Sequence, residues 1–154
     1  MDIEEVLNKE DILMFQDYKN KEEVFENLSN HLFQEKKISN KEEFFEALEN
    51  REKESFTGLT NGIAIPHGIS DAVLKPTVVY AKLINPIAWE CIDDVPVQDI
   101  FMLAIPQNDK SNIHIKMLSE LARSLMEEGV IESLKKAKTA DDILKIIKEG
   151  RGDL

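Results

Sequence analysis

The strongest constraint on the fold is the apolar run from Val97 to Ile105, which is rich in side chains that favour β-strands. Pro106 follows it, and proline has no amide hydrogen to donate to a neighbouring strand. The run is far shorter than the roughly 18 apolar residues that cross a bilayer. It therefore predicts the central strand of a sheet, with further strands at Asp11–Phe15, Ile63–Ile65 and Thr77–Leu83.

Helical patterns alternate with these strands. Asn20 and Asn40 each precede a glutamate by three residues, a spacing similar to a capping box, and an apolar stripe follows each of them. After the central strand, the pattern predicts a helix that starts near Asn112 and ends at Gly129. A short helix and a last one, capped by Thr139, come after it. The alternation predicts an α/β fold with a mixed parallel and antiparallel sheet flanked by helices.

Length and composition fit one globular domain. The chain has 154 residues, of which 42% are hydrophobic and 32% are charged, so it can form a core of its own. No repeat or long linker divides it. We therefore expect a single compact domain over residues 1–150 and a short C-terminal tail at 151–154.

The charge and the single cysteine exclude several classes of partner and site. A net charge of −11 disfavours nucleic acid and anionic membranes, because both repel an acidic surface. One cysteine, Cys91, excludes an internal disulfide and any multi-cysteine metal site. The acidic N-terminus lacks the basic and apolar regions of a signal peptide, so we expect a cytoplasmic protein.

A loop rich in glycine, threonine and asparagine, residues 57–62, leads through the predicted strand Ile63–Ile65 to Pro66, His67 and Gly68. Pro66 is expected to end the strand, and Gly68 to permit a sharp turn or the close approach of a ligand. An imidazole on such a support can act as a nucleophile while one ring nitrogen is held by a hydrogen bond. The alternative is an ordinary loop histidine.

Two further residues are candidates for the same site. His114 lies in the first turn of the predicted helix after the central strand, where unpaired amides favour an anion. Alternatively, it only borders the apolar face of that helix. Arg51 lies near the end of a helix, sixteen residues before His67; there it could bind an anion or simply complement the helix dipole. His31 and Cys91 are expected to have no chemical role.

The chain lacks the usual signatures of other enzyme classes. Its three histidines form no HExxH or HxH pattern, which disfavours a zinc site. GxxxxGK[ST], GxGxxG and GxSxG are also absent, so nothing in the sequence indicates a nucleotide site or a serine hydrolase.

In three places the sequence resembles the fructose/mannitol-type enzyme IIA family (EIIA type-2) of the bacterial sugar phosphotransferase system. The first is Gly62–Gly68, an apolar segment that ends in Pro-His. The second is the helix that begins at His114 and continues with regularly spaced leucines. The third is the Arg51-Glu52 pair before the loop. The resemblance extends over nearly the whole chain, with the motifs in the family's order.

This resemblance implies a function. His67 would take a phosphoryl group from the phosphohistidine of HPr and pass it to a cysteine on a sugar-specific enzyme IIB. His114 and Arg51 would bind or neutralise the phosphate, and the helix N-terminus would add amides. The family uses no metal or nucleotide cofactor in this domain, and it would meet the membrane only through enzyme IIC. Fructose is the sugar expected by default.

Three other interpretations stay open at this point. A regulatory protein of the nitrogen-related enzyme IIA type would accept phosphate on the same histidine but act by binding proteins. A non-catalytic binding module would use His67 structurally. A metal-dependent hydrolase would use the histidines as ligands.

Overall fold

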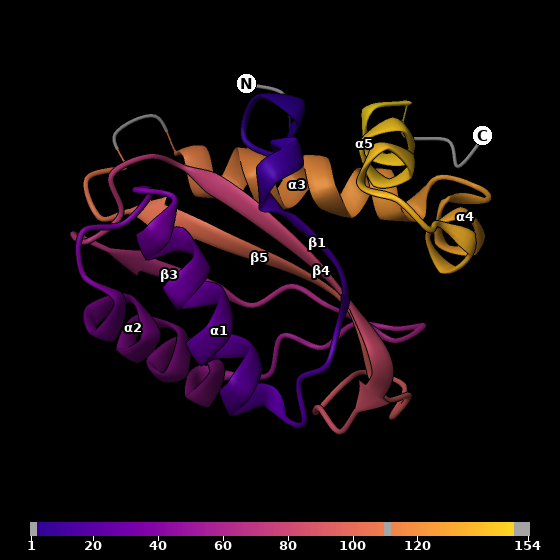
Figure 1. Cartoon of the computed structure of the whole chain (residues 1–154), viewed down its shortest axis with the longest axis horizontal. Coiled ribbons are helices and arrows are strands. Elements are labelled where there is room, and N and C mark those ends of the chain that lie inside the picture. The colour runs from indigo at the N-terminus through magenta and orange to yellow at the C-terminus, as the bar shows by residue number, and fades with distance from the viewer. Residues whose placement is uncertain (1–2, 110–111, 150–154) are drawn as a thin grey trace.

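The structure is a computed structural model that describes residues 3–109 and 112–149; the predicted tail at 151–154 lies outside the described residues. A five-stranded mixed sheet lies between two layers of helices (Figure 1). The predicted fold class is confirmed. The elements, in chain order, are the 3-10 turns Ile3–Glu5 and Lys9–Asp11, β1 (Ile12–Gln16), α1 (Lys21–Gln34), α2 (Lys41–Glu54), β2 (Ile63–Ala64), β3 (His67–Ser70), β4 (Thr77–Ile87), β5 (Val97–Pro106), α3 (Ile113–Met126), α4 (Val130–Lys136) and α5 (Ala140–Glu149).

The sheet is organised around β5, as the apolar run predicts. Its strand order is β1-β4-β5-β2, and β3 also pairs with β5. β4 runs antiparallel to β5, whereas β1 is parallel to β4, and β2 and β3 are parallel to β5. Ile63 is in register with Asp99, and His67 with Leu103. β2 and β3 therefore lie one after the other along the same edge of β5.

Helices cover both faces of the sheet, which explains why β5 is apolar without alternation. Phe101, Leu103 and Ile105 belong to the core beneath α3, α4 and α5. Ile100, Met102 and Ala104 belong to the core on the other face, beneath α1 and α2. Figure 1 shows the two helical layers on opposite sides of β4 and β5.

The predicted helix caps are present, with one correction. The side chains of Asn20 and Asn40 each accept the amide three residues ahead at 2.9 Å, and Thr139 caps α5 in the same way at 3.1 Å. Gly129, however, does not end α3. That helix ends at Met126, where Glu127 becomes extended, and Gly129 adopts a φ of 85° as the residue that leads into α4. A left-handed φ of this kind favours glycine.

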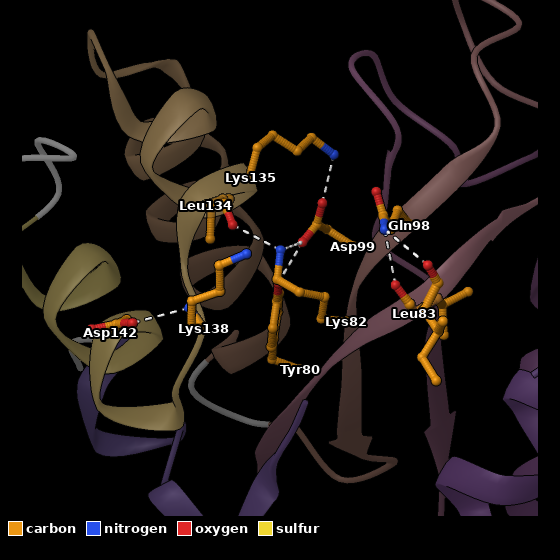
Figure 2. Close-up of polar contacts among 10 residues, drawn as sticks. Tyr80, Lys82, Leu83, Gln98, Asp99, Leu134, Lys135, Lys138 and Asp142 are labelled. Atoms are coloured by element: carbon orange, nitrogen blue, oxygen red, sulfur yellow. Dashed lines mark hydrogen bonds and ion pairs between the residues drawn. The ribbon is translucent and has the colours of Figure 1, made fainter. Parts of the chain in front are cut away.

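A buried ionic cluster connects β4, β5 and α4 (Figure 2). The carboxylate of Asp99 is fully buried and accepts hydrogen bonds from the hydroxyl of Tyr80, from Lys82 Nζ at 3.0 Å and from Lys135 Nζ at 2.5 Å. Lys82 Nζ also donates to the carbonyl of Leu134 at 2.7 Å. Burial and the adjacent carboxylate raise the pKa of Tyr80 well above its usual value. The cluster joins the C-terminal helices to the middle of the sheet.

We expect Asp99→Asn to lower the free energy of unfolding by about 3–5 kcal/mol, because the substitution leaves the buried ammonium of Lys82 without its counter-ion. Urea unfolding followed by circular dichroism measures this change. Glu132→Gln is the matched control, since it makes the same change in an exposed ion pair with Lys136 and leaves stability nearly unchanged. Equal stability of the two variants would contradict a structural role for the cluster.

Candidate functional site

The strand predicted before Pro66 is β2, which ends at Ala64, and His67 is the first residue of a second strand, β3, that the sequence analysis did not predict. Pro66 interrupts the edge for two residues because it has no amide to donate. Its carbonyl still accepts the amide of Leu103 at 2.9 Å, so the pairing with β5 resumes at His67. The imidazole therefore stands on a hydrogen-bonded strand and not on a free loop.

Gly68 serves packing and not a turn. Its φ is not positive, and a Cβ at this position would lie 3.0 Å from Cε1 of Phe44 and 3.5 Å from the methyl of Ala47. Both neighbours belong to α2. The missing side chain therefore allows α2 to approach β3 closely, and no ligand is needed to explain the glycine.

This approach places Arg51, in the last turn of α2, against His67. Arg51 Nε donates to His67 Nε2 at 3.0 Å, and Arg51 Nη1 donates to the carbonyl of Ser55 at 2.9 Å. The two side chains line a pocket of about 290 Å³ between α2 and β3, together with Ala47, Asn50, Glu54 and Ile69. The sequence predicts that both residues belong to one site, and the structure places them in direct contact.

The partners of the His67 ring determine its tautomer. Nδ1 lies 3.0 Å from the carbonyl oxygen of Ile65, which can only accept a hydrogen bond. Nε2 faces Arg51 Nε, which can only donate. Both contacts are satisfied when the ring is neutral, with a proton on Nδ1 and a lone pair on Nε2. Nε2 is therefore the ring nitrogen that could act as a nucleophile.

The charge state of His67 follows from its surroundings. Burial lowers its pKa most, and the positive charges of Arg51 and His114 lower it further. The hydrogen bond to Ile65 and the negative charge of Glu52 raise it, but by less, so the pKa lies below the ordinary histidine value. The ring is neutral at pH 7.

His114 is oriented by Asp109, a residue that the sequence analysis missed. The Asp109 carboxylate accepts the amides of Ile113 and His114 at 2.6 and 3.0 Å and His114 Nδ1 at 2.5 Å. These hydrogen bonds hold its pKa below the usual range, although burial acts to raise it. Asn112 has a left-handed backbone and makes no side-chain cap. An acidic residue just before a predicted helix was the available signal.

Asp109 also corrects the expected use of the helix N-terminus. The first two amides of α3 are bound to its carboxylate, and those of Ile115 and Lys116 donate to the carbonyl of Asn112. These amides are therefore not open to a phosphate. The sequence analysis expected both the amides and the His114 ring to bind an anion here. Since Nδ1 of that ring faces Asp109, its other nitrogen, Nε2, points away from Asp109.

The remaining candidates lie elsewhere. His31 Nε2 contacts the buried carboxylate of Asp11 at 2.8 Å, and Lys37 Nζ contacts the same carboxylate at 3.0 Å. This is a structural ion cluster between α1 and the start of β1. Cys91 is buried, and burial raises its thiol pKa. In the described ranges no group of three or more acidic, histidine or cysteine side chains could hold a metal ion.

Comparisons with known proteins agree with this geometry. A family model described as "Phosphoenolpyruvate-dependent sugar phosphotransferase system, EIIA 2" matches residues 5–150. The fructose-specific EIIABC component of the Bacillus subtilis phosphotransferase system is 32% identical over 97% of this chain, which spans only 23% of that relative.

No helix in the described part of the chain is long and apolar enough to cross a membrane.

Two solved structures are also similar. The nitrogen regulatory protein IIA-Ntr from Neisseria meningitidis matches with a TM-score of 0.85 and 31% identity, covering 94% of this chain and 98% of that one. Mannitol enzyme IIA from Escherichia coli, solved in complex with phosphorylated enzyme IIB, matches with a TM-score of 0.79 and 25% identity, covering 94% and 99%.

We expect His67 to titrate below the ordinary histidine value of about 6.5. The pH dependence of its ring resonances in NMR measures this pKa. Arg51→Met raises the pKa, because the guanidinium charge that opposes protonation is lost. Lys53→Met, which removes an exposed cation from the same helix, is the control and leaves it unchanged. A His67 pKa above 6.5 in the unmodified protein would contradict the site electrostatics.

Proposed function

This chain belongs to the EIIA 2 family of the phosphoenolpyruvate-dependent sugar phosphotransferase system, and we propose that it is a phosphotransferase that carries a phosphoryl group on His67. The donor is the phosphohistidine of HPr, and the acceptor is a cysteine of a sugar-specific enzyme IIB. The observation that best supports this role is that His67 Nε2 faces Arg51 and Nδ1 faces the carbonyl of Ile65. These two partners place the proton on Nδ1 and the lone pair on Nε2.

The transfer needs no external base. Nε2 attacks the phosphorus as the phosphorus–nitrogen bond of the donor breaks, and the bonding electron pair returns to the donor ring. His67 then has substituents on both nitrogens and is positively charged, while its Nδ1–H still donates to Ile65. A positively charged ring is a good leaving group, so a thiolate of enzyme IIB can take the phosphoryl group in a second in-line step.

Arg51 and His114 stabilise the charge on the phosphoryl oxygens. The Arg51 guanidinium covers Nε2 in the free protein, so it must turn to admit the phosphorus and then lies beside the equatorial oxygens. The His114 ring is held through Nδ1 by Asp109, which directs a proton on Nε2 toward the site when the ring is charged. Each residue thus binds the transferred group without forming a bond to it.

The sugar in this proposal is fructose, since the Bacillus subtilis relative is named for it. The exchange takes place in the cytoplasm, and the membrane is reached only through enzyme IIC. The similarity to a nitrogen regulatory protein supports a second function, in which phospho-His67 controls binding to another protein and no sugar is transported. Recovery of the phosphoryl group on the cysteine of a fructose-type enzyme IIB favours transport; its retention on His67 favours regulation.

We expect His67→Ala to abolish phosphorylation and His114→Ala to slow it by about 100-fold, as for the loss of one donor to a developing charge. The assay combines enzyme I, HPr and phosphoenolpyruvate and follows one acid-labile phosphoryl group by intact mass. His31→Ala, which lies outside the site, is the control for the loss of an imidazole. Normal labelling of the His67→Ala protein would overturn the proposal.

A further inference from the structure

Glu52 follows Arg51 in α2, but its side chain is directed into the protein and is only 6% exposed. Its carboxylate accepts three hydrogen bonds: from the Thr57 amide at 3.0 Å, from the Thr57 hydroxyl at 2.6 Å and from Trp89 Nε1 at 3.2 Å. Lys21 Nζ lies 3.6 Å from the same carboxylate. A buried carboxylate with this many donors specifies the position of the chain around it.

Hydrogen bonds connect Glu52 to His67 through Thr57 and Ile65. Thr57 donates its amide and its hydroxyl to Glu52, and its carbonyl accepts the amide of Ile65 at 3.0 Å. The carbonyl of Ile65 in turn accepts His67 Nδ1 at 3.0 Å. An uninterrupted series of short hydrogen bonds therefore runs from the end of α2 to the ring nitrogen that does not react.

We propose that Glu52 is a positioning residue for His67. It acts through Thr57 and Ile65 to hold the ring in the Nδ1–H tautomer, with Nε2 facing the incoming phospho-HPr. This inference rests on the phosphoryl transfer proposed above. Two consecutive residues of α2 then control the two ring nitrogens: Arg51 contacts Nε2 directly, and Glu52 controls Nδ1 at a distance.

The carboxylate is needed for two reasons. First, one oxygen accepts the Thr57 amide and Trp89 Nε1, and the other accepts the Thr57 hydroxyl, whereas a glutamine has one oxygen and its amide would reverse the bond to that hydroxyl. Second, its negative charge opposes that of Arg51 and raises the pKa of His67. It therefore favours the positive ring that forms when Nε2 is phosphorylated.

The test compares Glu52→Gln and Thr57→Val with Glu46→Gln, an exposed change of the same kind on α2. We expect kcat for phosphorylation by phospho-HPr to fall by about 10- to 100-fold in the first two variants, through misorientation of the nucleophile. The KM for phospho-HPr stays the same, since both residues are buried. The double variant loses no more than Glu52→Gln alone, because both changes act through one contact.

Nitrogen-15 NMR of the His67 ring supplies a readout that a purely structural role would not change. In the unmodified protein Nδ1 is protonated and Nε2 is not; in Glu52→Gln the two tautomers exchange and the His67 pKa falls. If Glu52→Gln does not fold, Thr57→Val, which removes only a hydroxyl, decides the question. Lower thermal stability with an unchanged ring spectrum and unchanged kcat would overturn the inference.

The two proposals fail in different ways. If the unmodified protein takes no phosphoryl group from HPr, the phosphotransfer function is wrong, and the ring spectra still test whether Glu52 sets the tautomer. If the unmodified protein is phosphorylated and Glu52→Gln matches it in both kcat and ring spectrum, the function stands and Glu52 has no positioning role.

Discussion

The parallel pairing of β5 with both β2 and β3 places the nucleophile. Between the two short strands Pro66 has no amide to donate and the Ile65 amide turns to Thr57, yet the Pro66 carbonyl accepts the amide of Leu103, so His67 begins a new strand at a defined position. Gly68 then lets α2 pack against that strand at van der Waals distance, which brings the last turn of α2 to the ring. The contact between Arg51 and His67 depends on this edge, because the pairing fixes where β3 lies against α2.

The two imidazoles of the site have partners of different charge, and this difference separates their roles. His67 Nδ1 donates to a neutral carbonyl and Nε2 faces a guanidinium, so the ring is neutral and nucleophilic. His114 Nδ1 contacts the carboxylate of Asp109, which fixes the orientation of the ring. In the proposed transfer, His67 forms the bond with phosphorus and His114 binds the phosphoryl oxygens. The opposite charges of Arg51 and Glu52 also act in opposite directions on His67, since Arg51 lowers the pKa of the ring and Glu52 raises it.

Much of the fold could be predicted because its signals are local. The apolar run of β5, the asparagine caps of α1 and α2 and the threonine cap of α5 each depend on residues within a few positions of one another. His67, His114 and Arg51 could be selected as candidates from short motifs. The end of α3 was misjudged, because Gly129 is equally suited to ending one helix and to leading into the next. Asp109 was missed although an acidic residue just before a predicted helix is a signal, because the sequence does not specify which side chain of the polar loop reaches the helix amides.

By itself, the sequence determined the α/β class and the central strand, and it made His67 a candidate for the site. The tertiary structure alone decided which ring nitrogen of His67 has the lone pair, because the contact of Nε2 with Arg51 is set by how α2 packs on β3. It also decided that Glu52 is buried and that Asp99 is surrounded by Tyr80, Lys82 and Lys135. Hydrogen bonds and ion pairs form only when donor and acceptor, on segments far apart in the chain, lie about 3 Å from each other. That distance must hold to within a few tenths of an ångström, and no local pattern of residues encodes it.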